Sequence, residues 1–202
     1  MEEEVLKTIQ TYNEYAEKYF QTHNSIDAIK NLLELFIENL DGKKILDVGC
    51  GPGRDAKFFA DLGYEVVGID LSEKLLEIAR KNAPKAKFYL MDMRNLDFPN
   101  NYFDGIWACA SFLHVPRKDA RRTLNEFYRV LREDGLIYIS VKEGRGERFV
   151  KSEQYGEKER YFVYYSSVEL RKLIENCGFK VFEELIEKEK DGDTWINIFA
   201  RK

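Results

Sequence analysis

The amino-acid sequence predicts an α/β fold, with helices on both faces of a mostly parallel sheet that ends in an antiparallel hairpin strand. Strand and helix signals alternate from Lys43 onward, which is typical of parallel strands connected by helices. Near the C-terminus, the turn Asp191-Gly192-Asp193 separates two strand-like runs and indicates a hairpin. The length of 202 residues, 44% of them apolar, is sufficient for one domain with a substantial core.

Local patterns place the individual elements along the chain. Residues 3–21 and 25–40 are expected to be helical, because apolar and tyrosine side chains recur at helical spacing and Ser25 suits an N-cap. Apolar runs predict strands over residues 44–48, 65–69, 86–90, 103–109 and 135–142. Gly63 and Pro84 would end the first two of three further helices, over residues 54–62, 73–82 and 117–131. In the last third, residues 143–165 are charged and aromatic without a regular period. A helix is expected over residues 167–176, and strands are expected over residues 179–187 and 194–200.

A glycine-rich turn after the first predicted strand carries the strongest functional signal. The strand ends in Asp47, and Gly49, Gly51 and Gly53 alternate with other residues before a helix begins. Glycine lets such a turn pass close beneath a ligand, because it has no Cβ and tolerates positive φ. The next strand ends in Asp70, about 20 residues past the middle glycine, the spacing at which a carboxylate reaches ribose hydroxyls. These features together predict an adenosine-containing cofactor.

Small differences from the dinucleotide fingerprint indicate which cofactor is bound. That fingerprint, G-x-G-x-x-G, places a pyrophosphate on the helix N-terminus. Here the third glycine comes one residue early, and Arg54 stands where the fingerprint has glycine. The Asp47 carboxylate would repel a pyrophosphate, but it suits a ligand that carries an ammonium or sulfonium group. The stretch resembles the first motif, D-x-G-x-G-x-G, of class I S-adenosylmethionine-dependent methyltransferases.

The resemblance covers nearly all of residues 41–202 and implies a Rossmann-like, seven-stranded sheet. It also implies S-adenosylmethionine as cofactor and S-adenosylhomocysteine as product. The three loop glycines would lie beneath the amino-acid portion of the cofactor, with Asp47 near its positive charge. Arg54, which lies in the loop, would pair with the cofactor carboxylate in preference to Lys18.

The same resemblance assigns the ends of the second and third strands to the nucleoside. Asp70 would accept hydrogen bonds from both ribose hydroxyls, and Leu71 would pack beside the adenine. Alternatively, Asp70 would serve with Ser72 as an N-cap of the next helix. Asp92 would accept the adenine amino proton and Met93 would offer its backbone amide, unless Asp92 is only a surface turn residue.

Two further groups are expected on the methionine side of the cofactor. Ala108 and Cys109, at the end of the fourth strand, would touch the methionine portion. A nucleophilic Cys109 is disfavoured, because a thiol in an apolar strand is usually inert. Tyr12 and Tyr19, with Tyr15, would close over the cofactor, or would simply pack an aromatic stripe against the core.

The candidate general bases are His114, Tyr164 and Glu143. The neutral range of a histidine pKa suits proton transfer, but His114 would more simply brace the loop that follows the fourth strand. Residues 160–165 are expected to line the acceptor pocket or to pack aromatic side chains onto the sheet. A base is needed only for an acceptor that is protonated at working pH, so a fixed catalytic triad is not expected.

The sequence therefore predicts one methyltransferase domain over residues 1–202. Residues 1–40 would form an N-terminal helical cap, and residues 41–142 a cofactor-binding core. Residues 143–165 would form a substrate cap, and residues 166–202 a C-terminal helix with hairpin. The predicted reaction is methyl transfer from S-adenosylmethionine to a small-molecule acceptor. The alternatives are a non-catalytic regulator that binds S-adenosylmethionine and, less favoured, a nicotinamide-dependent oxidoreductase. The sequence does not specify the acceptor, the methylated atom or the oligomeric state.

Charge and composition narrow the range of partners. The net charge of −4 offers no general attraction to nucleic-acid phosphates, so a nucleic-acid substrate is not expected. The N-terminus lacks the features of a signal peptide, and the apolar stretch over residues 105–115 is too short to span a bilayer. Cys50, Cys109 and Cys177 are scattered, which argues against a disulfide framework or a zinc site. We expect a cytoplasmic protein without a metal ion or membrane contact.

Overall fold

The computed structural model describes residues 2–189 and 192–202. Its strands are β1 (Lys44–Val48), β2 (Glu65–Asp70), β3 (Lys87–Leu90), β4 (Phe103–Ala108), β5 (Leu131–Lys142), β6 (Glu147–Lys151), β7 (Glu159–Val163), β8 (Lys180–Lys188) and β9 (Thr194–Arg201). Its α-helices are α1 (Glu3–Glu14), α2 (Ala16–His23), α3 (Lys30–Asn39), α4 (Arg54–Asp61), α5 (Glu73–Asn82), α6 (Arg117–Val130) and α7 (Ser167–Glu175). Three short 3₁₀ helices are η1 (Asp27–Ile29), η2 (Phe112–His114) and η3 (Glu153–Tyr155).

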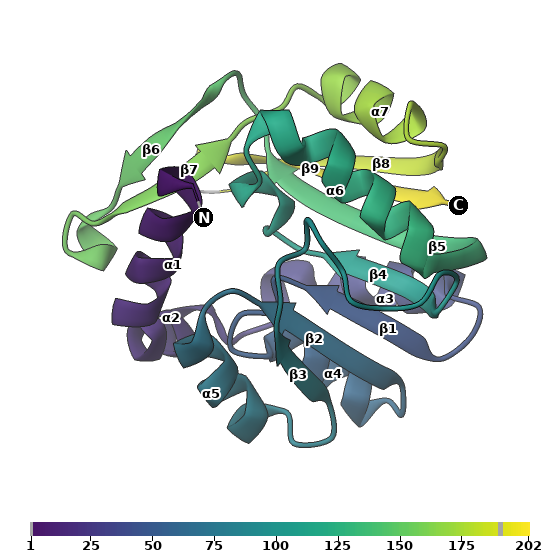
Figure 1. Cartoon of the computed structure of the whole chain (residues 1–202), viewed down its shortest axis with the longest axis horizontal. Helices are drawn as coiled ribbons and strands as arrows, with labels where there is room; N and C mark the ends of the chain where they lie inside the picture. Colours follow the sequence, from purple (N-terminus) through teal and green to yellow (C-terminus); the bar gives the residue numbers. More distant parts are fainter. Residues whose placement is uncertain (1, 190–191) are drawn as a thin grey trace.

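The main sheet has seven strands in the order β3-β2-β1-β4-β5-β9-β8 (Figure 1). Neighbouring strands from β3 to β5 are parallel, and β9 is antiparallel to both β5 and β8. The predicted Rossmann-like sheet with an antiparallel C-terminal strand is therefore confirmed. The strand order reverses between β1 and β4, so the carboxyl ends of these strands form the crevice in which open α/β sheets bind ligands.

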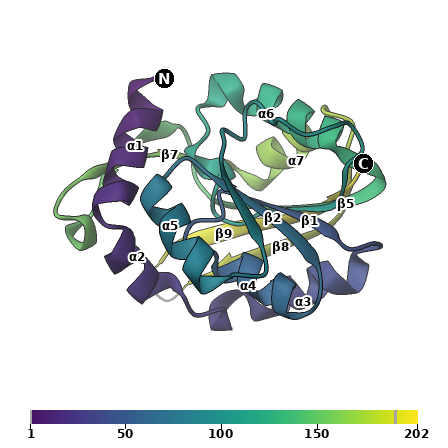
Figure 2. The same cartoon turned by 60° about the horizontal axis from the view of Figure 1, so that its bottom comes forward.

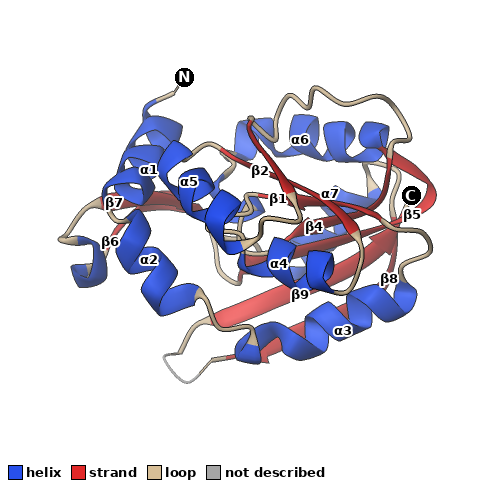
Figure 3. Cartoon of the chain, turned by 90° about the horizontal axis from the view of Figure 1, so that it is seen from below, coloured by secondary structure: helices blue, strands red, loops and turns tan. Residues whose placement is uncertain are grey.

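Alternate residues of the central strands supply two hydrophobic cores, one on each face of the sheet. Ile45 and Trp107 lie in the core that α3, α4 and α5 cover. Leu46 follows Ile45 in β1, and Ile106 precedes Trp107 in β4. Both lie in the core that α6 and α7 cover (Figures 2 and 3). Successive side chains of a strand point to opposite faces, so a strand buried on both sides is apolar throughout.

The N-terminal helical region contains more elements than we predicted. The single helix expected over residues 3–21 is wrong, because the backbone of Tyr15 (φ −111°, ψ 22°) separates α1 from α2. The second helix begins at Lys30, after a 3₁₀ turn, and not at residue 25. The Ser25 hydroxyl accepts the backbone N–H of Asp27 at 3.1 Å, so it caps the approach to this 3₁₀ turn and not the long helix.

Residues 143–165, in which we predicted no regular element, contain the antiparallel hairpin β6–β7. This hairpin lies beside α1 (Figure 1), although the two segments are about 150 residues apart. The Thr11 hydroxyl donates to the backbone carbonyl of Glu159 at 2.8 Å. The Thr8 hydroxyl accepts the backbone N–H of Tyr161 at 2.9 Å. Helix α1 and the hairpin therefore form one continuous wall.

The other predicted elements agree with the structure to within a few residues. Strand β5 begins at Leu131, earlier than expected, because this residue already pairs with Phe103 before a register shift. Strands β8 and β9 pair from Lys188 and Thr194, as expected for a hairpin. The predicted turn residue Asp191 lies outside the described residues. No helix in the described part of the chain is both long enough and apolar enough to cross a membrane.

Candidate functional site

A cavity lies at the carboxyl ends of β1, β2, β3 and β4, with α1 and α2 on its other side. Its empty volume, including the solvent at its mouth, is about 850 Å³. The predicted site residues that line it are Tyr12, Tyr19, Gly49, Gly51, Asp70, Leu71, Asp92, Met93, Cys109 and His114. The structure thus brings together residues from most of the N-terminal two thirds of the chain.

The glycine loop that follows β1 has a backbone that other residues rarely adopt. The φ angles of Gly49, Gly51 and Gly53 are +67°, +52° and +81°. A Cβ added to Gly49 would overlap the Cβ of Ser111, and one added to Gly53 would come within 3.1 Å of the Cβ of Ala79. Packing therefore requires glycine at position 49 and disfavours a side chain at position 53.

At Gly51, by contrast, an added Cβ would meet only the ring of Tyr19, at 3.8 Å. The side chain missing at Gly51 thus leaves open space in the cavity. Gly53 does not line the cavity, since it lies on the side that packs against α5. The open space at Gly51, which a Cβ would begin to fill, allows a ligand to approach the backbone closely.

The Asp70 carboxylate ties the glycine loop to the end of β2. One oxygen accepts the backbone N–H of Gly51 at 2.9 Å, and the other accepts that of Ser72 at 2.8 Å. Ser72 itself caps α5, because its hydroxyl accepts the backbone N–H of Leu75 at 3.2 Å. Burial raises the pKa of Asp70, and the backbone N–H groups act against that rise. Each carboxylate oxygen has two lone pairs, so Asp70 retains acceptor capacity towards the cavity that it lines.

Asp47 lies beneath the loop with 2% of its surface exposed, and it does not line the cavity. Its Oδ2 atom has no hydrogen-bond partner among the described residues. Burial, reinforced by the neighbouring charge of Asp55, raises the pKa of Asp47 well above its ordinary value. A cation bound in the cavity would favour the charged form of this carboxyl group. The unpartnered Oδ2 atom therefore fits a ligand with a positive charge.

Arg54 is already paired within the protein. Its Nε and Nη2 atoms donate to the two oxygens of Asp55, at 2.6 and 3.1 Å. Asp55 also accepts the indole N–H of Trp107 at 2.8 Å, which fixes the carboxylate from the core side. Arg54 does not line the cavity, so its pairing with a cofactor carboxylate stays a prediction.

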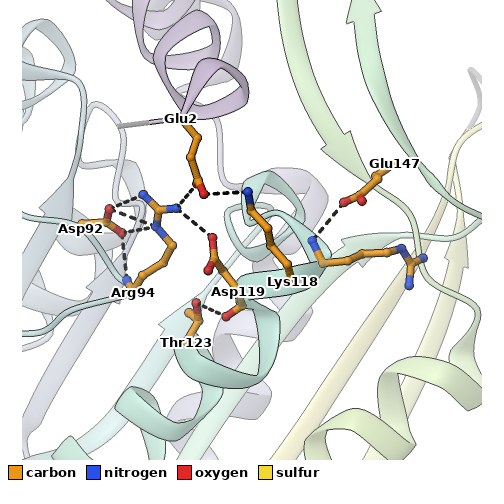
Figure 4. A network of polar contacts seen from close by, with 8 residues as sticks. Glu2, Asp92, Arg94, Lys118, Asp119, Thr123 and Glu147 are labelled. Atoms are coloured by element: carbon orange, nitrogen blue, oxygen red, sulfur yellow. Dashed lines mark hydrogen bonds and ion pairs between the residues drawn. The ribbon is translucent and has the colours of Figure 1, made fainter.

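A network centred on Arg94 closes one edge of the cavity (Figure 4). Its guanidinium donates to Asp92, with an Nη2–Oδ2 distance of 2.7 Å, and through Nη1 to Glu2 at 2.8 Å and Asp119 at 3.0 Å. Lys118 also pairs with Glu2, at 2.7 Å. These contacts hold the start of α1 against the end of β3 and the start of α6. We did not predict a role for Arg94, because two of its three partners, Glu2 and Asp119, come from distant segments.

The segment after β4 contains two features that we did not predict. Ala110, which lines the cavity, has a φ of +51°, a conformation that costs a residue with a Cβ about 1–3 kcal/mol. The neighbouring Ser111 hydroxyl is buried without a hydrogen-bond partner among the described residues.

Cys109 lines the cavity, whereas Ala108 is fully buried and does not. Burial raises the pKa of the Cys109 thiol to about 12, which agrees with an inert thiol and not with a nucleophile.

Both ring nitrogens of His114 are engaged. Nδ1 lies 2.6 Å from the backbone carbonyl of Tyr161, and Nε2 lies 3.0 Å from the hydroxyl of Tyr12. Because a carbonyl only accepts, Nδ1 carries the proton and Nε2 accepts from Tyr12. Burial, together with the charges of Arg160 and Lys142, lowers the pKa of His114 to about 3, although the hydrogen bond to Tyr161 acts in the opposite direction. This geometry favours the loop-bracing role, and the general-base role stays an untested prediction.

The depressed pKa of His114 predicts how stability depends on pH. Between its folded pKa of about 3 and its ordinary value of 6.5, the unfolded chain binds a proton that the folded protein does not. Lowering the pH through this range should therefore favour unfolding, by at most about 1.4 kcal/mol per pH unit. Urea unfolding at about pH 7 and about pH 5 should show a smaller pH effect for His114→Gln than for the unaltered protein. Burial also lowers the pKa of His23, so His23→Gln is measured beside His114→Gln to separate the contributions of the two histidines. An unchanged pH effect in His114→Gln would contradict the neutral, buried imidazole.

The remaining base candidates lie outside the cavity. The Tyr164 ring packs against the guanidinium of Arg148, whose carbon atom lies 3.9 Å from the ring centre. Glu143 is exposed and forms a bridge with Tyr165. The geometry therefore gives neither residue a route to a ligand in the cavity. In the part of the chain that the structure describes, no group of His, Cys, Asp and Glu side chains could hold a metal ion.

Sequence comparisons place this arrangement among known proteins. The family described as "Methyltransferase domain" matches residues 45–135. The chain is 35% identical over 136 residues to "Methyltransferase GfsG" of Streptomyces halstedii, an alignment of 60% of this chain and 48% of that protein. It is 33% identical over 139 residues to "Demethylmenaquinone methyltransferase" of Symbiobacterium thermophilum, covering 62% and 50%. The chain thus spans about half the length of these curated relatives.

A comparison with solved structures extends the likeness over almost the whole chain. The structure of Burkholderia thailandensis 1,6-didemethyltoxoflavin-N1-methyltransferase, with 1,6-didemethyltoxoflavin and S-adenosylhomocysteine bound, matches with a TM-score of 0.79. The match covers 98% of this chain and 87% of that one, at 22% identity. At this level of identity the match shows a shared fold and no more. Because it covers 98% of this chain, the shared fold extends to the N-terminal helices and the C-terminal hairpin.

Proposed function

The chain contains a class I S-adenosylmethionine-dependent methyltransferase domain, and from this premise we propose that it transfers a methyl group from its cofactor to a small-molecule acceptor. S-adenosylmethionine is the cofactor. The observation that carries the proposal is the pairing of Gly51 with Asp70. Gly51 leaves open space in the cavity, and its N–H holds a carboxylate that lines the same cavity.

The proposed roles follow from position around the cavity. Asp70 accepts the ribose hydroxyls, and Leu71 packs beside the adenine. Asp92 and Met93 meet the adenine edge, and the glycine loop lies beneath the methionine portion. Asp47 supplies a negative charge from below the loop, where its unpartnered oxygen supports the role.

When bound, S-adenosylmethionine supplies an electrophilic methyl group and a good leaving group. The protein therefore has to align the acceptor, exclude water and steady charge. Alignment of this kind lowers a barrier by up to about 7–11 kcal/mol. The wall formed by α1 and the β6–β7 hairpin excludes water, and the hydrogen bond from Tyr12 to His114 fixes that wall to the loop after β4.

We propose that residues 1–40 and 143–165 cap the acceptor, and that residues 41–142 hold the cofactor. The acceptor enters beside Cys109, Ala110 and His114, which line the cavity after β4. The relatives named above are described as acting on demethylmenaquinone or 1,6-didemethyltoxoflavin, which are small molecules. A net charge of −4 supports an acceptor other than nucleic acid. A cytoplasmic location belongs to the same proposal.

Calorimetric titration with S-adenosylhomocysteine tests the proposal, together with a methyl-transfer assay against a panel of small acceptors followed by mass spectrometry. We expect saturable binding, and a mass increase of one methyl group on at least one acceptor. A folded sample that binds neither S-adenosylmethionine nor S-adenosylhomocysteine would contradict the assignment. Binding without turnover across the panel would instead indicate a regulator, and a fluorescence shift of tightly bound NADH would indicate an oxidoreductase.

A further inference from the structure

Arg160, on β7, is a partly buried cation, and no carboxylate of the described residues neutralises its charge. No Asp or Glu of residues 2–189 and 192–202 forms an ion pair with its guanidinium. Its Nη1 donates to the hydroxyl of Tyr12 at 3.1 Å, and its Nε is buried without a hydrogen-bond partner among these residues. Buried charges in proteins are normally paired, because removing an ion from water costs several kcal/mol (about 3–5 when a partner is missing).

The surroundings of Arg160 are aromatic. Its guanidinium carbon lies 4.3 Å from the ring centre of Tyr155, 5.0 Å from that of Phe162 and 5.5 Å from that of Tyr12. Each such ring attracts a cation by about 0.5–2 kcal/mol, which offsets part of the cost of burial but leaves the Nε–H group without a hydrogen-bond partner among the described residues. The hydroxyl of Tyr155 is also buried without a hydrogen-bond partner among the described residues. Two neighbouring side chains therefore have unused donors.

Arg160 contacts the acceptor side of the cavity through Tyr12, although neither Arg160 nor Tyr155 lines the cavity itself. Tyr12, to which it donates, lines the cavity and donates in turn to His114. Phe162, which packs against the guanidinium, also packs against the His114 ring at 4.8 Å. Two other cations near the cavity are neutralised, since Arg54 pairs with Asp55 and Lys142 pairs with Asp193.

We infer that Arg160 recognises an anionic group, a carboxylate or phosphate, on the methyl acceptor. The inference rests on the proposed function and adds a substrate class to it. A guanidinium presents a planar fork of N–H donors that matches both anions, and Tyr155 adds a neutral donor beside it. The anion completes the ion pair that the protein lacks, and the Tyr12–His114 contact joins this site to the loop after β4.

Binding of inorganic phosphate and of acetate to protein saturated with S-adenosylhomocysteine tests the inference. Calorimetry at fixed ionic strength, with chloride as the reference anion, should show saturable binding of at least one probe. Arg160→Gln should weaken it by at least about tenfold, and Arg160→Lys by less, because lysine keeps the charge but not the fork. Arg148→Gln is the matched control. Arg148 lies on the neighbouring strand and, like Arg160, packs on a tyrosine ring. It also has no carboxylate partner among the described residues.

Two results of this titration would overturn the inference. One is a response of the unaltered protein that does not exceed that of chloride. The other is an equal loss in Arg160→Gln and Arg148→Gln. Circular dichroism and the unfolding midpoint show whether each variant is folded. If Arg160→Gln does not fold, the comparison of Tyr155→Phe and Arg160→Lys with the unaltered protein still decides, and unchanged affinity in both excludes the site.

Two further ligands test whether Arg160 binds the anion of the acceptor or the carboxylate of the cofactor. S-adenosylhomocysteine carries a carboxylate, whereas 5′-methylthioadenosine lacks the amino-acid portion. We expect Arg160→Gln to bind both as the unaltered protein does. A selective loss of S-adenosylhomocysteine affinity would overturn the inference, because Arg160 would then hold the cofactor carboxylate, and the proposed function would stand. If the unaltered protein binds neither nucleoside, the proposed function fails, and the phosphate titration without nucleoside reports on Arg160 by itself.

Discussion

Gly51→Ala should give a folded protein whose affinity for S-adenosylhomocysteine is lower by about 10- to 100-fold, since a methyl group forced into a filled site costs about 1–3 kcal/mol. The backbone φ of +52° adds a cost of about 1–2 kcal/mol to stability for a residue with a Cβ. No protein atom lies closer than 3.8 Å to the new methyl group, so the fold should accept it. The cofactor would not, because the methyl group occupies the space above the loop. Calorimetry and urea unfolding measure the two effects separately.

Gly49→Ala and Gly63→Ala are the matched comparisons. An alanine Cβ at Gly49 overlaps Ser111, so this variant should lose about 2–5 kcal/mol of unfolding free energy. Gly63 has a φ of +89° and nothing within 4 Å of an added Cβ, so Gly63→Ala measures the backbone cost alone. If Gly51→Ala binds S-adenosylhomocysteine as Gly63→Ala does, the methionine portion does not lie above this loop.

Asp70→Asn should weaken the binding of S-adenosylhomocysteine by about 1.5–3 kcal/mol for each charge-assisted hydrogen bond that is lost. The substitution preserves the shape of the side chain but leaves one acceptor oxygen for the two N–H groups of Gly51 and Ser72. We therefore expect a loss of affinity from the ribose hydroxyls and a smaller loss of stability from the loop. Calorimetry and urea unfolding again separate these quantities.

Asp61→Asn is the control for the change of charge, because Asp61 is an exposed residue of α4 that pairs only with surface lysines among the described residues. It should leave cofactor affinity unchanged. Equal affinities of Asp70→Asn and the unaltered protein would mean that another residue holds the ribose. A large loss of stability without loss of affinity would leave Asp70 with a structural role alone.

The central sheet and the glycine loop could be predicted because their signals are local. A parallel strand covered on both faces is a continuous apolar run, as Ile45 and Leu46 illustrate by entering opposite cores. The positive φ of Gly49, Gly51 and Gly53 depends on the missing Cβ, which is visible in the sequence. The acid at the end of β2 follows at a spacing that the fold fixes.

The acceptor side could not be predicted in the same way. The β6–β7 hairpin has no regular apolar period, because its order depends on hydrogen bonds to Thr8 and Thr11 of α1. Nothing in the local sequence distinguishes Arg94 or Arg160 from the many charged surface residues. Their importance comes from burial and from partners in distant segments.

The sequence by itself therefore determined the sheet, the glycine loop and the acid that follows it. Only the tertiary structure decided which side chains close the cavity, which of their charges are neutralised and which lack a partner. The physical reason is that backbone conformation and periodic burial are encoded over a few residues. The pairing of buried charges, in contrast, depends on which distant segments meet when the chain folds.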